Sequence, residues 1–110
     1  MILINPHRFK SKTLKTGLLA CWELSETSGD TVFDSHGSYH GANGGVTGSK
    51  FTLNQTGLMG RCIQANSTQN NIEMGNVLNI GASDFSIIGW IKTSNYGTFL
   101  GKTDMQWRLS

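Results

Sequence analysis

The chain has little proline, cysteine and charge, and it has no long apolar run. Its 110 residues include one proline and two cysteines, and 15% of them are charged. So low a charged fraction argues against a long solvated helix or a charged disordered tail. No stretch approaches transmembrane length, so we expect no membrane contact. The apolar start is too short for a signal peptide, which predicts a protein made in a cytoplasm and not exported by that route.

Glycine is abundant where proline is scarce. With 14 glycines, the turns are made by Gly, Asn, Ser and Asp, which suits short strands joined by tight turns. No helical periodicity of useful length is present. At this length there is room for one domain at most. The composition therefore predicts a single all-β domain.

The clearest strand signal is the segment Asp-Phe-Ser-Ile-Ile-Gly-Trp at residues 84–90. Alternate residues from Phe85 to Ile91 fall on one face, and Ile88 and Trp90 fall on the other. A strand that is apolar on both faces must be covered on both. The pattern thus predicts a central strand with Trp90 in the core.

Weaker patterns predict further strands, at residues 18–24, 45–47, 60–65, 70–74, 98–102 and from 107 onward. Trp22 lies in the first of them and is expected in the core. Cys21 and Cys62 sit in apolar strand contexts, where a buried free thiol acts as a small hydrophobe. A disulfide between them remains open if their strands lie side by side.

Positive charge is concentrated at the start. Residues 1–16 carry four basic residues and no acid, a local charge of +4, whereas the remainder sums to −2. We divide the chain into an extended basic arm, 1–16, and a β domain, 17–110. The arm is either a solvated surface segment or an anchor that adds to a neighbour's sheet edge or groove. Without interleaved aromatics or a basic helix, nucleic acid is not an expected partner.

Five blocks in order resemble laminin-G-like domains of the concanavalin A type. Residues 17–29 are similar to the opening Leu-x-Ala-x-Trp-x-Leu strand and its Ser-Gly turn, and 31–37 to the Asp-Ser-x-Gly loop. Residues 58–65 and 71–74 resemble the next two strands. Residues 84–92 are close to the Asp-Phe-Thr-Ile-Ser-Ala-Trp-Val-Lys consensus.

The resemblance implies a concanavalin A-like (laminin-G-like) jelly-roll sandwich. Family members are much longer, so residues 17–110 look like its first half. Either further sequence or neighbouring subunits would complete the sheets. At the rim of such sandwiches relatives often hold calcium.

The start of the chain is similar to an Ile-Asn-Pro-Tyr-Arg-Phe peptide of tailed-bacteriophage virion proteins. The resemblance implies docking to other virion proteins through five residues, which are Ile4, Asn5, Pro6, Arg8 and Phe9. It also implies an oligomeric assembly located in the virion.

The residues offer no catalytic constellation. No two acids lie two apart, and the nearest pair, Glu23 and Glu26, falls on opposite faces if extended. Retaining sugar hydrolysis needs a nucleophile and an acid a few ångströms apart. None of His7, His36 and His40 lies in a nucleophile motif. We therefore predict a protein that is not an enzyme.

A calcium site is the only metal site considered. Glu26, Asp30 and Asp34, with carbonyls of a Gly-rich segment, could supply the oxygen ligands that calcium prefers. The alternative is that Asp34 and Ser35 cap their own turn. His36 and His40 would suit zinc only on a helix, which this loop is not.

Sugar binding needs exposed aromatic faces beside polar groups. Tyr39, Tyr96 and Trp107 are the candidates, because they adjoin Gly and Ser or polar residues. Two functions follow. The first is a non-enzymatic virion structural protein of the tail or capsid surface, anchored by its arm. The second is a carbohydrate-binding adhesion module that recognises host surface glycans.

Overall fold

The computed structural model describes residues 2–4, 16–94, 100–103 and 106–109. Within these ranges the protein is all-β, with strands joined by turns and loops and no helix. The strands are β1 (Ile2–Ile4), β2 (Ala20–Trp22), β3 (Thr31–Val32), β4 (Gly41–Asn43), β5 (Thr52–Gly57), β6 (Gly60–Gln64), β7 (Ile72–Gly75), β8 (Ile87–Ile88), β9 (Leu100–Thr103) and β10 (Gln106–Leu109).

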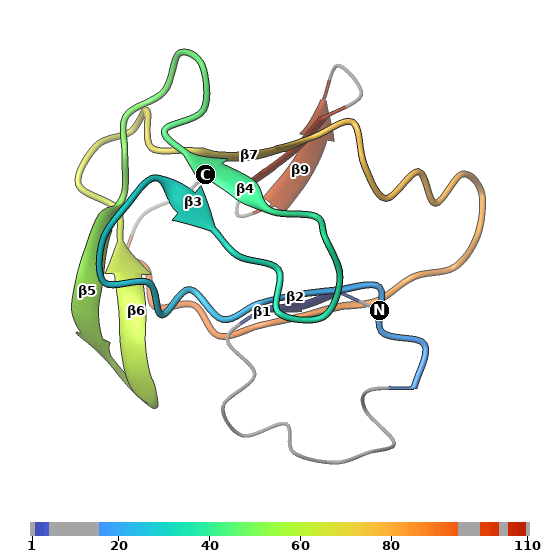
Figure 1. Ribbon diagram of the computed structural model, residues 1–110, viewed down its shortest axis with the longest axis horizontal. Coiled ribbons are helices and arrows are strands. Elements are labelled where there is room, and N and C mark those ends of the chain that lie inside the picture. The colour runs from blue at the N-terminus through green and yellow to red at the C-terminus, as the bar shows by residue number, and fades with distance from the viewer. Residues whose placement is uncertain (1, 5–15, 95–99, 104–105, 110) are drawn as a thin grey trace.

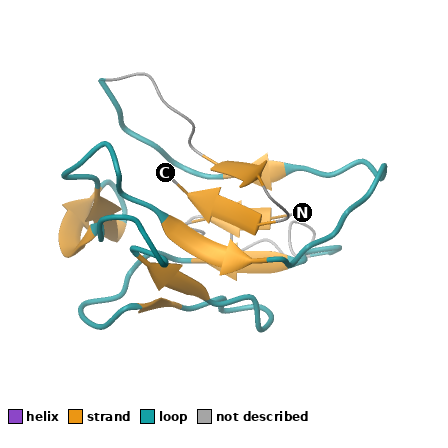
Figure 2. Ribbon diagram, turned by 90° about the horizontal axis from the view of Figure 1, so that it is seen from above, coloured by secondary structure: helices purple, strands orange, loops and turns teal. Residues whose placement is uncertain are grey.

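The strands form two larger sheets and one hairpin. The first sheet has the order β2-β1-β8, and β1 runs parallel to both neighbours. The second has the order β3-β4-β7-β10-β9 and is antiparallel throughout. β5 and β6 pair only with each other and stand apart from both sheets, at the left of Figure 1. Figure 2 shows the same arrangement from above.

The two larger sheets share one core. Ile2, Ala20 and Trp22 of the first sheet pack with Val32 and other residues of the second, and Trp22 is 1% exposed. The remaining buried members are Leu24, Ile72, Met74 and Leu78. Within the second sheet, Gly41 on β4 leaves room for the side chain of Ile72 on the neighbouring strand β7, since a Cβ at Gly41 would lie 2.5 Å from it. The predictions of an all-β fold and of a buried Trp22 are confirmed.

The predicted arm begins inside the domain. Ile2 pairs with Ala20 on one side and Ile87 on the other, and its side chain is completely buried. Residues 2–4 are thus the middle strand of the first sheet rather than part of an extended arm. Three apolar residues are too short a pattern to distinguish a strand from a sticky tail, which is why the sequence interpretation was wrong here.

The prediction that residues 84–92 form a central strand with Trp90 in the core is also wrong. Only Ile87–Ile88 form a strand, and β8 lies at the margin of its sheet. Phe85 and Trp90 are each 51% exposed, and Ile91 is 59% exposed. Ile88 packs against Leu18 and Cys21 in a small second cluster. The segment is apolar on both faces, but the described residues do not cover it.

Most of the remaining strand predictions are confirmed, one is wrong, and one strand was not predicted. Strands expected near residues 60–65, 70–74, 98–102 and 107 are present as β6, β7, β9 and β10. The one expected at 45–47 is wrong, because these residues form a turn that leaves Val46 90% exposed. β5 is polar in composition and gave no apolar alternation. Both cysteines are free, Cys21 buried and Cys62 partly so.

We expect Ile2→Ala to destabilise the protein by about 2–4 kcal/mol, since it removes most of a completely buried side chain. Urea unfolding followed by tryptophan fluorescence measures the change. Leu58→Ala is the matched control, because Leu58 is 80% exposed, and its effect should stay below about 0.5 kcal/mol. Equal effects for the two variants would mean that residues 2–4 are not a strand of the domain.

Candidate functional site

The carboxylate of Asp34 accepts four hydrogen bonds from backbone N–H groups. Its Oδ1 accepts hydrogen bonds from the backbone N–H of Cys21 at 2.9 Å, His36 at 2.9 Å and Gly37 at 3.0 Å. Its Oδ2 accepts one from the N–H of Tyr39 at 3.1 Å. Asp34 is only 4% exposed. One carboxylate therefore satisfies four backbone donors, one from β2 and three from its own loop.

Further hydrogen bonds fix the same loop to β2. The N–H of Ser35 donates to the carbonyl of Cys21 at 2.8 Å, and Trp22 Nε1 donates to the carbonyl of Tyr39 at 2.8 Å. The N–H of Asp34 donates to Nδ1 of His40 at 3.0 Å, which requires that this nitrogen carry no proton. Residues 34–40 are thus held against the first sheet at both ends.

Gly37 is required by the closeness of this packing. A Cβ at this position would lie 3.0 Å from Asp34 Oδ2 and 3.5 Å from the carbonyl oxygen of Leu19. The Asp-Ser-x-Gly pattern is therefore a structural unit, in which the aspartate accepts the donors and the glycine leaves room for it.

The pKa of Asp34 lies below its ordinary value. Burial raises the pKa, but the hydrogen bonds from Gly37, Cys21, His36 and Tyr39 lower it and prevail. The ionised form is preferred because four donors point at it. The interpretation of Asp34 as the cap of its own turn is confirmed by these bonds.

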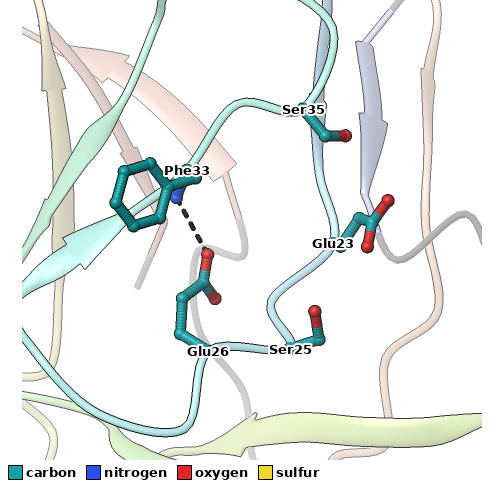
Figure 3. Close-up of a pocket in the computed structure, with 5 residues that line it drawn as sticks. All are labelled: Glu23, Ser25, Glu26, Phe33 and Ser35. Carbon is teal, nitrogen blue, oxygen red and sulfur yellow. Dashed lines mark hydrogen bonds between the residues drawn. The ribbon is translucent and has the colours of Figure 1, made fainter.

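Beside this loop lies an open pocket of about 230 Å³, lined by Glu23, Ser25, Glu26, Phe33 and Ser35. Figure 3 shows the Phe33 ring and the Glu26 carboxylate at one side and the Glu23 carboxylate at the other. Glu26 Oε1 accepts the N–H of Phe33 at 2.8 Å. Phe33 is 56% exposed, and its ring meets that of His40 edge-on at 5.3 Å.

The backbone after β2 explains why both glutamates reach one pocket. Leu24 has a φ of 55°, in the left-handed region, so the alternation of an extended strand is broken between Glu23 and Glu26. Such a backbone costs roughly 1–2 kcal/mol, and burial of the Leu24 side chain offsets it. The expectation that the pair falls on opposite faces held only for an extended chain, and the chain is not extended here.

The three calcium candidates are not assembled into a metal-binding group. Asp34 uses its oxygens on backbone N–H groups, Asp30 forms a 2.8 Å ion pair with Lys50, and Glu26 bonds to Phe33. Glu26 Oε2 is buried without a partner. Within the described ranges, no three His, Cys, Asp or Glu side chains are grouped so that they could hold a metal ion.

Only some of the residues predicted to bind glycans or to dock a partner lie within the described residues. Tyr39 is half-buried and packs against the core, so its ring is not the open platform expected of it. Trp107 lies on β10, and the structure describes its backbone only. Ile4 lies in β1. Outside the described residues lie Tyr96, Asn5, Pro6, Arg8 and Phe9.

Sequence reasoning missed the pocket residues Glu23, Ser25, Phe33 and Ser35 as a group. Phe33 is preceded by Val32 in a short apolar pair, which gives no sign that one side chain is buried and the other exposed. Only the turn at Leu24 brings the group together, and a leucine with positive φ has no sequence signal.

Comparison with known proteins leaves the family open. No protein-family model matches the chain, and neither curated proteins nor solved structures give a match. Among the described residues there is no helix long and apolar enough to cross a membrane.

We expect Asp34→Ala to destabilise the protein by about 2–4 kcal/mol, because it leaves one buried and three partly buried N–H groups without their charged acceptor. Asp34→Asn should cost less, since an amide oxygen can replace Oδ1 while its NH₂ cannot accept from Tyr39. The matched control is Asp30→Asn, in an exposed ion pair, which should cost about 0.5 kcal/mol or less. Urea unfolding at neutral pH measures all three.

The pH dependence follows from the lowered pKa of Asp34. The stabilisation that the ionised Asp34 carboxylate gives the folded protein is fully present above the pKa of about 4 that the group has in the unfolded chain. It is lost as the pH falls through the lower pKa of Asp34 in the folded protein. The difference in unfolding free energy between the wild type and Asp34→Asn should therefore shrink below about pH 4. A difference that is constant down to the acid transition would contradict this assignment.

Proposed function

We propose that the chain is a non-enzymatic structural protein of a tailed-bacteriophage particle, in its tail or on its capsid surface. In this proposal the two packed sheets are the first half of a laminin-G-like jelly roll. The basic segment near the N-terminus docks the domain to other virion proteins, and the sheets form a rigid platform.

The observation that carries the proposal is the place of β1. It lies between β2 and β8 in the sheet, so residues 5–19 connect β1 and β2, two neighbouring parallel strands. Arg8, Lys10, Lys12 and Lys15 lie in this connection. Because both ends of this basic connection are strands of the packed domain, a partner bound to it would be joined directly to the platform.

The pocket supports the non-enzymatic part of the proposal. Glu26 Oε1 is occupied by the N–H of Phe33, and Glu26 Oε2 is buried. A general acid or nucleophile must reach the atom on which it acts. Glu26 therefore serves the conformation of its loop, and Glu23 has no second free carboxylate beside it.

The docking role is tested by Arg8→Glu/Lys10→Glu, with β1 left intact. The double variant should reduce the amount of protein in purified particles about tenfold or more, as expected when several ion pairs are reversed. Quantitative mass spectrometry of the particles measures the amount. Lys50→Glu/Arg61→Glu makes the same charge change at exposed positions of the domain and should leave incorporation unchanged. Equal incorporation of both variants would exclude the docking role.

A second candidate function is supported by the pocket itself. An exposed aromatic ring near hydroxyls and a carboxylate is the combination that sugars favour, and Phe33 shares the pocket with Ser25, Ser35 and Glu23. The same particle protein could then recognise host surface glycans, with or without calcium.

The glycan role is tested on a glycan array with and without calcium. If it holds, Phe33→Ala should weaken binding about fivefold, since loss of aromatic stacking costs about 1 kcal/mol. Leu58→Ala, which alters an exposed side chain away from the pocket, is the control. A wild-type protein that binds no glycan on the array excludes the second function and leaves the first untouched.

A further inference from the structure

An exposed apolar strip runs along the β8 margin of the first sheet, at residues 84–92. Half of the eight large hydrophobic side chains that are exposed in the described residues lie in it, namely Phe85, Ile87, Trp90 and Ile91. The other four are scattered elsewhere. Apolar side chains gathered in this way, rather than spread singly, mark a surface that another molecule covers.

The strip also lies at a sheet margin. β1 pairs with one side of β8, and among the strands that the structure describes none pairs with the other side. The carbonyl of Ser86 accepts the N–H of Ile2 at 2.9 Å, so it points toward β1. Because backbone groups alternate along a strand, those of Ile87 point away from β1, toward the open margin. Such an edge is a template for pairing with another strand.

The charges at the ends of the strip indicate what covers it. Asp84 and Lys92 are the only charged residues between Glu73 and Lys102, and both are exposed. They lie equally far from Ile88, one on each side. When two copies of the strip align antiparallel about Ile88, each Asp84 comes opposite the Lys92 of the other copy. A parallel alignment would instead put like charges opposite each other, which is unfavourable.

The same alignment is compatible with the side chains between the charges. Phe85 comes opposite Ile91, an aromatic–aliphatic pair of the kind that stabilises sheets. Ile87 comes opposite Gly89, so in the two pairs that flank the central Ile88–Ile88 pair one partner has no side chain, which leaves room for the isoleucines. An isologous contact demands that one surface complement itself, and this strip does so in both charge and shape.

We propose that residues 84–92 form a two-fold symmetric interface with a second copy of this chain, in which the strips pair antiparallel about Ile88. The occupant is a second copy because the strip carries both members of each charge pair. The inference goes beyond the proposed function and does not depend on it, since two copies can associate whatever particle or ligand they serve.

The charge pairs provide the decisive experiment, by sedimentation velocity over a dilution series. The wild type should be a dimer that dissociates on dilution. Asp84→Lys and Lys92→Asp should each raise the dissociation constant about 10- to 100-fold, because each turns two attractive pairs into two repulsive ones. Mixing the two variants should restore association, since the mixed dimer has an opposite charge at both pairs. The double variant Asp84→Lys/Lys92→Asp should also dimerise.

Two controls separate the interface from general effects of charge and folding. Lys50→Asp makes the same charge change as Lys92→Asp at an exposed position in a different ion pair and should leave the dimer intact. Trp90→Ser should abolish the dimer, whereas Val46→Ser, at a side chain that is 90% exposed outside the strip, should not. Circular dichroism confirms that each variant retains its β structure.

A wild-type protein that is monomeric throughout the dilution series would overturn the proposal. So would a dimer that ignores all the charge variants, or one that the mixture and the double variant both fail to restore. Restoration in both, with the single variants weakened, establishes the antiparallel alignment.

Discussion

The carboxylate of Asp34 is the interaction on which the rest of the described structure depends. It comes from the segment that follows β3 of the five-stranded sheet, yet it accepts the N–H of Cys21 in β2 of the other sheet. Its remaining bonds bend the chain through residues 35–39, so that Tyr39 can accept the indole N–H of Trp22. One ionised group therefore joins the two sheets at their rim and orients the largest core side chain.

The two edges of the first sheet, β2 and β8, differ in what covers them. At the β2 side, the loop of Asp34 covers the sheet with hydrogen bonds and leaves Trp22 buried. At the β8 side the described residues provide no such cover, and apolar side chains on both faces meet solvent. Among the described residues, the first sheet is therefore covered where its polar loop packs and exposed where its most apolar segment lies.

Sequence reasoning succeeded where local pattern decides the outcome. Trp22 lies in an alternating run and is buried, and the Asp34–Gly37 pattern forms the turn that its residue types favour. It failed where burial or strand pairing depends on residues that are distant in the sequence. Trp90 has as apolar a context as Trp22, but its burial depends on what lies across the sheet. Ile2–Ile4 become a strand only because β2 and β8 flank them. The turn at Leu24 that gathers the pocket has no local signal either.

The parallel pairing of β1 with β8 has a consequence for biosynthesis. Ile2 and its partner Ile87 are 85 residues apart in the sequence, so Ile87 leaves the ribosome well after Ile2. Contacts of such long sequence separation slow folding, because a large loop must close before they form. Until Ile87 has been made, β1 has only β2 as a neighbouring strand, so the first sheet is completed late in synthesis.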